Sequence, residues 1–460
     1  MSEPIASKGR GMKLHTKILL GLLVGAALGV AANFTLGGGH DAVVWLNRYV
    51  AGPVGQIFLR MLFMIVVPLV FASIALGVAG LGDLRKVGRV GGKALGYFLV
   101  TTAIATTIGL VAVNTVRPGG RLDPAVREQL LQTYAKDASS NVEAAAVSNF
   151  GIETIVNLVP RNPVRAAADL DLLGLIFFSF IFGMALTMIT VERARPVVQF
   201  LEGLNDVVIK IVGFAMRLAP YGVTALIFGV TSRFGFDLLA PLAGYVLVVL
   251  GALVVQGFGV NSLILRGVIG ISPRLFFGRI RSAIVTAFST SSSSATLPTN
   301  LAVSQRNLGI PASISGFVLP LGATMNMNGT ALFEGITVLF LAQVFGLDLS
   351  IGQQAIVVVM SVLTAVGAAG VPGGSIPLLV GILAMFGIPP AGIAIILGVD
   401  RILDMARTTV NVMGDVAAAA WVAKSEGAWT AANVPPASAT LEATGGRDES
   451  PDNTPLTTAP

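Results

Sequence analysis

The sequence DRILDMARTTVNVMGD, residues 400–415, follows an uncharged run at residues 349–399. Six of its polar side chains recur at helical spacing and therefore share one stripe of a single helix. They are Asp400, Asp404, Arg407, Thr408, Asn411 and Asp415. Ionisable groups in a helix at membrane depth are costly and normally face a partner or a water-filled cavity. The stripe is therefore predicted to form a functional site, with structural ion pairs between helices as the alternative.

The composition is that of a polytopic membrane protein. The chain of 460 residues is 54% hydrophobic and 12% charged, whereas a soluble domain is roughly a quarter charged. It contains no Cys, which excludes disulfides, thiol catalysis and cysteine metal sites. His15 and His40 lie outside the apolar runs, so a histidine-based zinc site or general base is not expected. The net charge of +6 is assigned to cytoplasmic loops and not to nucleic-acid binding.

Basic clusters between apolar runs set the predicted topology. Lysines and arginines before Ile18 place the N-terminus in the cytoplasm, and later clusters return the chain to that side. Gly21, Gly25 and Gly29 are four residues apart and predict a close helix-packing face. The predicted regions are a cytoplasmic tail at residues 1–14, a membrane-embedded body at 15–424, an external loop at 117–171 and a disordered cytoplasmic tail at 425–460.

Three segments interrupt the apolar runs of the second half. A serine run at residues 289–294 has no apolar flank long enough to span a membrane, and GAAGVPGGSIP at 367–377 divides the uncharged run. Both are predicted to be tips of re-entrant hairpins, because irregular backbone at membrane depth must lie inside protein or beside water. An ordinary loop at 367–377 is the alternative, but the final helix would then lie on the opposite side of the membrane from its expected position.

The third interruption, GATMNMNGT at residues 322–330, predicts a broken helix. Unwound carbonyls and amide oxygens are suitable ligands for a hard cation such as sodium. A polar packing patch between helices is the alternative.

These segments resemble the signature segments of the dicarboxylate/amino acid:cation symporters, the family of the excitatory glutamate transporters and their prokaryotic relatives. The matching segments are STSSSSATLP (289–298), NMNGTALFE (326–334), GAAGVPGG (367–374) and the DRILDMARTTVNVMGD sequence. The resemblance implies an all-α polytopic membrane protein with eight transmembrane helices plus two re-entrant helical hairpins, working as an elevator-type transporter and assembled as a homotrimer. It implies scaffold helices at about 15–80 and 172–233 and a transport domain at about 92–116 and 238–424.

The resemblance also implies substrate-binding roles. Arg407 would bind the side-chain carboxylate of the substrate together with Thr330, and Asp404 would bind its ammonium group. The α-carboxylate would be held by Thr408, Asn411, Ser291, Ser292 and Ser293. Residues 371–375, which include Val371, Gly373 and Ser375, would close over the substrate as an outer gate.

Three sodium sites are implied in the same way. The first would consist of Gly322, Asn326, Asn411 and Asp415, the second of Thr324 with the backbone at 365–368, and the third of Thr101, Thr102, Asn326 and Asn328. The family has Asp where this chain has Asn328, so the third site lacks a negative charge, and charge count tunes cation affinity. Glu334 is a candidate proton carrier, because a buried carboxylate holds its proton more readily than one in water. Pairing with a basic group such as Arg401 is the alternative.

The predicted function is a secondary active symporter that moves glutamate or aspartate into the cell with sodium, and with protons if Glu334 carries them. Carrying both Asp404 and Arg407 favours an acidic amino acid over an amine-free C4-dicarboxylate or a neutral amino acid, and symporters of those two kinds remain alternatives. An anion channel fits less well, because the mixed charges form no ring of one sign. No enzymatic activity, cofactor or nucleic-acid partner is expected, and membrane lipid surrounds the protein. The expected location is the plasma (inner) membrane, with both termini cytoplasmic.

Overall fold

The computed structural model describes residues 12, 14–87, 89–122, 127–128, 159–168, 172–235, 239–368 and 370–436. Within these ranges the chain forms helices and short connections and no strand, which confirms the predicted all-α class for the described residues. Most of the predicted N-terminal tail, most of the predicted external loop and the C-terminal tail beyond residue 436 lie outside the described residues.

Among the described residues, six helical stretches are long and apolar enough to cross a membrane. They are Thr16–Leu36, Asp41–Leu76, Arg89–Gly120, Val191–Phe234, Leu239–Ile269 and Ala312–Val344. Shorter apolar helices occupy Gly174–Met188, Ile351–Val366 and Ile376–Met385. The protein is therefore a multi-pass membrane protein, and the finer prediction of eight spans stays a prediction.

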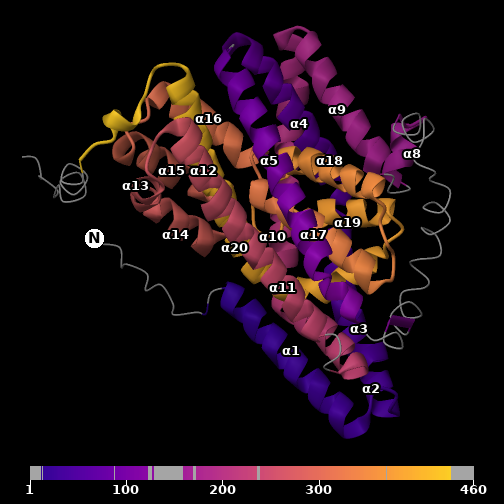
Figure 1. Ribbon diagram of the computed structural model, residues 1–460. Coiled ribbons are helices and arrows are strands. Elements are labelled where there is room, and N and C mark those ends of the chain that lie inside the picture. Colours follow the sequence, from indigo (N-terminus) through magenta and orange to yellow (C-terminus); the bar gives the residue numbers. More distant parts are fainter. Residues whose placement is uncertain are drawn as a thin grey trace, which may run out of the picture.

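The helices of the first half of the chain, coloured indigo to magenta in Figure 1, pack in part through glycines. Its helices are α1 (Leu14–Leu36), α2 (Asp41–Leu46), α3 (Gly52–Phe63), α4 (Val66–Val87), α5 (Arg89–Val116), α8 (Pro163–Ala168), α9 (Leu172–Met188) and α10 (Val191–Phe234). A Cβ on Gly21 would lie 2.6 Å from the Pro220 carbonyl oxygen, and one on Gly25 would lie 2.5 Å from that of Thr224. The predicted glycine face is thus confirmed as the contact of α1 with α10.

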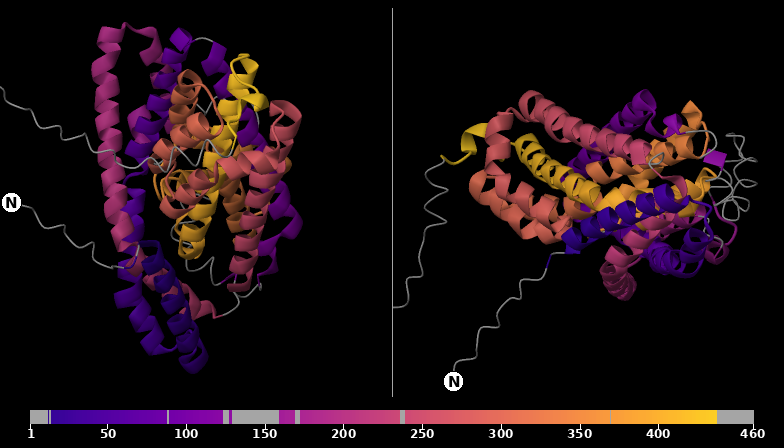
Figure 2. Two further views of the ribbon diagram at one scale, coloured as in Figure 1. Left: turned by 90° about the vertical axis from the view of Figure 1, so that its left-hand side faces the viewer. Right: turned by 90° about the horizontal axis from the view of Figure 1, so that it is seen from below.

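The second half surrounds two central helices. Its elements are α11 (Leu239–Val254), η3 (Val255–Val260), α12 (Asn261–Ile264), η4 (Leu265–Ile269), α13 (Pro273–Arg279), α14 (Arg281–Thr290), α15 (Ser293–Ala302), η5 (Val303–Asn307), α16 (Ala312–Met325), α17 (Asn328–Val344), α18 (Ile351–Gly367), α19 (Ile376–Met385) and α20 (Ala394–Ser425). Every residue of α17 and most residues of α20 are buried. Figure 2 shows α20, in yellow, running between other helices in both views.

Each predicted interruption separates two helices. We call α14 and α15 the first helix pair; its tip is Ser291, in the left-handed region at φ 50°, and Ser292. We call α18 and α19 the second helix pair; the described part of its tip is residue 368 and residues 370–375. The predicted broken helix is the junction of α16 and α17 at Asn326 and Met327. The interruptions therefore bring irregular polar backbone to the middle of the molecule.

The disordered tail was predicted to begin at residue 425, but residues 425–436 pack against the rest of the protein. The helix α20 continues to Ser425, and Trp429 is 1% exposed, with its indole Nε1 donating a hydrogen bond of 2.8 Å to the Leu308 carbonyl oxygen. Nearby, Arg279 donates a hydrogen bond to the Pro435 carbonyl oxygen. Residues 425–436 are therefore ordered against the segment that follows the first helix pair.

Candidate functional site

The polar stripe of α20 faces the protein interior. Arg407 is 1% exposed and Asp415 is 0% exposed, and the other four residues are also buried. The helix α17 approaches α20 closely at Gly329. This residue has no room for a side chain, because a Cβ there would lie 2.4 Å from the Arg407 carbonyl oxygen. Close approach of the two helices therefore places Arg407 beside the start of α17.

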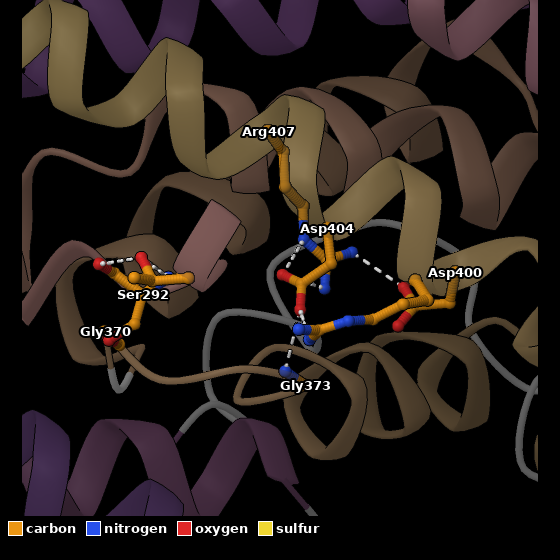
Figure 3. A network of polar contacts seen from close by, with 8 residues as sticks. Ser292, Gly370, Gly373, Asp400, Asp404 and Arg407 are labelled. Carbon is orange, nitrogen blue, oxygen red and sulfur yellow. Dashed lines mark hydrogen bonds and ion pairs between the residues drawn. The ribbon is translucent and has the colours of Figure 1, made fainter. Parts of the chain in front are cut away.

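Two aspartates hold the Arg407 side chain (Figure 3). Its Nη1 lies 2.9 Å from Asp400 Oδ1, and its Nε lies 3.1 Å from Asp404 Oδ1. The guanidinium carbon also lies 4.2 Å from the centre of the Phe333 ring, a cation–π contact. Arg401 completes the group, with Nη1 3.4 Å from Asp404 Oδ2. All of these ion pairs join residues within α20. The alternative prediction, ion pairs that connect different helices, is therefore not observed for this network.

The tips of the two helix pairs meet beside this network, as Figure 3 shows. Ser292 Oγ donates a hydrogen bond of 2.6 Å to the Gly370 carbonyl oxygen, and the Ser294 amide donates one of 3.2 Å to the same oxygen. Gly373 lies in the left-handed region at φ 73°, and its amide donates a hydrogen bond of 3.1 Å to Asp404 Oδ2. The second tip is therefore bonded both to the first tip and to α20.

A small cavity lies between the tips and α20. Its volume is about 10 Å³, which is about the space needed by a single water molecule. The lining residues are Ser291, Ser293, Met327, Thr330, Ala368, Gly370, Val371, Gly374, Ser375, Asp404, Arg407, Thr408 and Asn411. Most of the predicted substrate-binding residues are brought together here, and Ser292 and Gly373 lie directly behind them through the hydrogen bonds above.

Three lining residues, Met327, Ala368 and Gly370, lie outside both the predicted substrate-binding residues and the predicted gate at 371–375. Met327 lies at the helix break, and Gly370 lies in the GAAGVPGG segment, where a Cβ would be 2.6 Å from Ser294 Oγ. The signal for Gly370 was its place at the predicted tip, where a close approach of two backbones requires glycine.

The first predicted sodium site is an assembled cluster of oxygens. Asn326 Nδ2 donates a hydrogen bond of 2.9 Å to Asp415 Oδ1, and a Cβ on Gly322 would lie 2.6 Å from that same oxygen. Asn411 Oδ1 accepts a hydrogen bond of 2.7 Å from the Gly329 amide. The remaining oxygens, Asp415 Oδ2 and Asn326 Oδ1, are buried and have no hydrogen-bond partner within the described residues.

The third predicted site differs, because the polar atoms of three of its four residues, Thr101, Thr102 and Asn328, are hydrogen-bonded. Thr102 Oγ1 donates a hydrogen bond of 2.7 Å to Asn328 Oδ1, and Asn328 Nδ2 donates one of 3.3 Å to Thr101 Oγ1. Thr101 Oγ1 in turn donates one of 2.8 Å to the Tyr97 carbonyl oxygen. Thr324, of the second site, is exposed, with its hydroxyl bonded to Leu321 of its own helix.

Glu334 is completely buried on α17. Its Oε2 lies 2.7 Å from Thr364 Oγ1 on α18, and its Oε1 has no hydrogen-bond partner among the residues described. The alternative pairing with Arg401 is not observed, since the ion pair of Arg401 is with Asp404. No group of three or more His, Cys, Asp or Glu residues suited to a metal ion occurs in the described ranges.

Residues 14–425 match the model of the "Sodium:dicarboxylate symporter family". The chain belongs to this family. The match confirms the resemblance found from the signature segments, and it makes this protein a symporter of small molecules whose α20 carries the buried network just described.

Several relatives of this symporter match more than four fifths of its length. The "Proton/sodium-glutamate symport protein" of Bacillus caldotenax is 36% identical over 91% of this chain and 96% of its own. The "Proton/glutamate-aspartate symporter" of Escherichia coli (strain K12) is 37% identical over 90% of this chain and 93% of its own. The "C4-dicarboxylate transport protein" of Bacillus subtilis (strain 168) is 36% identical over 81% of this chain and 87% of its own.

Proposed function

We propose that this symporter moves an acidic amino acid, glutamate or aspartate, into the cell together with sodium. The observation that carries the proposal is that Asp404 and Arg407 face one buried cavity from adjacent turns of α20. A carboxylate suits the substrate's ammonium group, and a guanidinium suits its side-chain carboxylate. Hydroxyl and amide groups remain for the α-carboxylate, and they come from Ser293, Thr408 and Asn411.

Substrate entry requires the second helix pair to move. The cavity of about 10 Å³ is too small for an amino acid. Three hydrogen bonds hold the second tip in place, two at the Gly370 carbonyl oxygen and one at the Gly373 amide. Breaking them would free residues 371–375 to open the site, which is the gate function predicted from the sequence. In this proposal the two helix pairs are the re-entrant hairpins.

The oxygens around Asp415 are suited to sodium. A completely buried carboxylate without a basic partner needs another source of positive charge, and within the described residues the side-chain partner of Asp415 is the neutral amide of Asn326. Asp415 Oδ2 and Asn326 Oδ1 are free acceptors, which are the ligands that hard cations prefer. We assign sodium, transported as a substrate, to this cluster. We assign none to the Asn328 cluster, because its oxygens already accept or share hydrogen bonds and it lacks a carboxylate.

Proton transport through Glu334 is supported by a count of hydrogen atoms. Thr364 has one hydroxyl proton, but its Oγ1 lies 2.8 Å from the Met360 carbonyl oxygen and 2.7 Å from Glu334 Oε2. A carbonyl oxygen only accepts. Both contacts are therefore satisfied at once when Thr364 donates to Met360 and a protonated Glu334 donates to Thr364.

The elevator arrangement is supported by how the helices pack. Rings of Phe71 on α4 and Phe182 on α9 lie 5.2 Å apart in the proposed scaffold, whose helices α1 and α10 pack through glycines. In the proposed transport domain, Gly109 of α5 and Gly335 of α17 allow close contact between these two helices. We propose that these two bodies move relative to each other, within a homotrimer at the plasma (inner) membrane.

Uptake of radiolabelled aspartate into proteoliposomes tests the assignment of Asp404. The Asp404→Asn variant should lose aspartate uptake, since the ammonium group would lose its counter-charge. Thr409→Val is the matched control, because Thr409 is on the same helix but bonds only to the Met405 carbonyl oxygen. Unchanged aspartate affinity in Asp404→Asn would contradict the proposal.

A further inference from the structure

Two arginines contact the carboxylate of Asp404, and the proposed function gives a role to only one of them, Arg407. Its Oδ1 is held by Arg407, and its Oδ2 accepts from the Gly373 amide at 3.1 Å and lies 3.4 Å from Arg401 Nη1. The Arg401 side chain is buried, so water and salt screen its charge only weakly from the nearby Asp404 carboxylate. Arg401 has no role in the binding of an acidic amino acid described above.

Arg401 is loosely held in comparison with Arg407. Its contact with Asp404 is 3.4 Å long, whereas the contacts of Arg407 with Asp400 and Asp404 are 2.9–3.1 Å long. The Arg401 contact is therefore the easiest of the Asp404 contacts to replace.

We propose that Arg401 substitutes for the ammonium group of the substrate at Asp404, so that the site accepts four-carbon dicarboxylates without an amino group as well as acidic amino acids. The inference rests on the proposed function, because it takes from it the position of the ammonium group at Asp404. It assigns Arg401 as a residue that determines substrate specificity.

The charges of the network explain how one site serves both substrates. Asp400 and Asp404 are balanced by Arg401 and Arg407. When Arg407 turns to a substrate carboxylate, Asp400 and the Oδ1 atom of Asp404 both lose it as a partner, and this loss is the same for either substrate. An amino acid supplies an ammonium group in compensation, which replaces Arg401 at Oδ2. A dicarboxylate supplies none, but Arg401 stays, so Asp404 keeps a cation in both complexes.

Without Arg401 the two substrates are no longer equivalent. A dicarboxylate would leave Asp404 with the Gly373 amide as its only partner among the contacts described here, and a buried carboxylate without a cation is strongly unfavourable. An amino acid would still bring its own cation. Removing the charge of Asp404 has the opposite effect, because the ammonium group loses its partner while Arg401 becomes available to a second carboxylate.

The test compares uptake of radiolabelled succinate and aspartate by the full-length protein in proteoliposomes. The variants are Arg401→Gln, Arg401→Lys and Asp404→Asn, with Arg48→Gln as a control arginine outside the network. We expect wild type and the control to transport both substrates. Arg401→Gln should lose about tenfold or more in kcat/KM for succinate and keep aspartate within about threefold. Arg401→Lys should restore part of the succinate uptake, and Asp404→Asn should lose aspartate preferentially.

Three results would overturn the inference while leaving the proposed function intact. These are aspartate uptake by wild type that succinate neither shares nor inhibits, an equal loss of both substrates in Arg401→Gln, which would indicate a structural role, and unchanged succinate uptake in Arg401→Gln. Uptake of neither substrate by wild type would contradict the proposed function itself, and the inference with it.

Discussion

Arg407 is the residue on which the proposed choice of substrate depends most. It is 1% exposed, lies against Phe333 and is held by Asp400 and Asp404. A planar guanidinium binds a carboxylate through two parallel hydrogen bonds, which a smaller neutral side chain cannot do. The side chain must exchange its aspartate partners for the substrate, so its loss affects acidic substrates first.

Replacing Arg407 by Cys should abolish glutamate and aspartate uptake and leave some uptake of neutral amino acids. The reason is that the α-carboxylate and the ammonium group keep their partners, while the side-chain carboxylate loses its own. Uptake of labelled aspartate and labelled serine, measured side by side, gives the answer. Acidic uptake that survives unchanged would show that Arg407 does not bind the substrate.

Asn328 offers a second test at the residue scale. Changing Asn328→Asp adds one negative charge among Thr101, Thr102 and Asn326, and it removes the amide group that donates to Thr101. Because charge count tunes cation affinity, the variant should transport about one more sodium ion per substrate molecule than wild type does. The ratio of labelled sodium to labelled aspartate flux measures this. An unchanged ratio would mean that Asn328 is not what keeps sodium from this cluster.

The polar stripe of α20 was predictable from helical spacing, but the partners within it were not. Pairing of Arg401 with Glu334 was the alternative to proton transport, and Arg401 pairs with Asp404 instead. A long flexible side chain reaches several groups one turn away, and spacing alone does not choose among them. The partner of Glu334 is Thr364, whose position on α18 depends on how the second helix pair folds back.

At the scale of elements, the interruptions were predictable for different reasons. The serine run has no apolar flank long enough to span a membrane, whereas glycine, proline or polar residues break the uncharged runs at 322–330 and 367–377. The ordered C-terminal segment was not predictable, because residues 425–436 are rich in Ala and Pro and show no apolar period. Its order depends on Trp429, which is buried against Leu308 of a segment far away in the sequence. Such a long-range contact leaves no local pattern.

Trp429→Ala should destabilise the protein by about 3–5 kcal/mol, the usual cost of removing a buried aromatic side chain. Thermal unfolding of the purified protein in detergent measures the loss. Trp45, which is 58% exposed, provides the matched control, since Trp45→Ala removes no buried contact. Equal melting temperatures for the two variants would contradict the packing described for Trp429.

Glu426 connects the same C-terminal segment to α5. Arg89 and Lys93 lie 2.7 Å and 2.6 Å from its carboxylate and lower its pKa from 4.5 to about 2. A carboxyl whose pKa is lowered by folding stabilises the protein above its unfolded pKa and loses this contribution as the pH falls. Wild type should therefore exceed Glu426→Gln in melting temperature at pH 7, and the difference should shrink between pH 4.5 and 2. A difference that is constant with pH would rule out this ion pair as its source.

At the scale of the whole molecule, the sequence indicated a membrane protein directly, through hydropathy and charge. The division into a scaffold and a transport domain came from the family resemblance, because periodicity within single helices does not say which helices move together. The structure shows glycine contacts of α1 with α10 and of α5 with α17, each within one proposed body, and the division itself stays a proposal. The buried site lies on the α17 and α20 side of that division.

The central claim is that sodium bound near Asp415 drives accumulation of an acidic amino acid. Uptake of labelled aspartate and glutamate into proteoliposomes, with sodium and proton gradients imposed separately, tests it most directly. We predict accumulation with an inward sodium gradient at equal pH on both sides. Accumulation driven by a proton gradient in the absence of sodium, with no response to sodium, would contradict the claim and would assign the coupling to Glu334 instead.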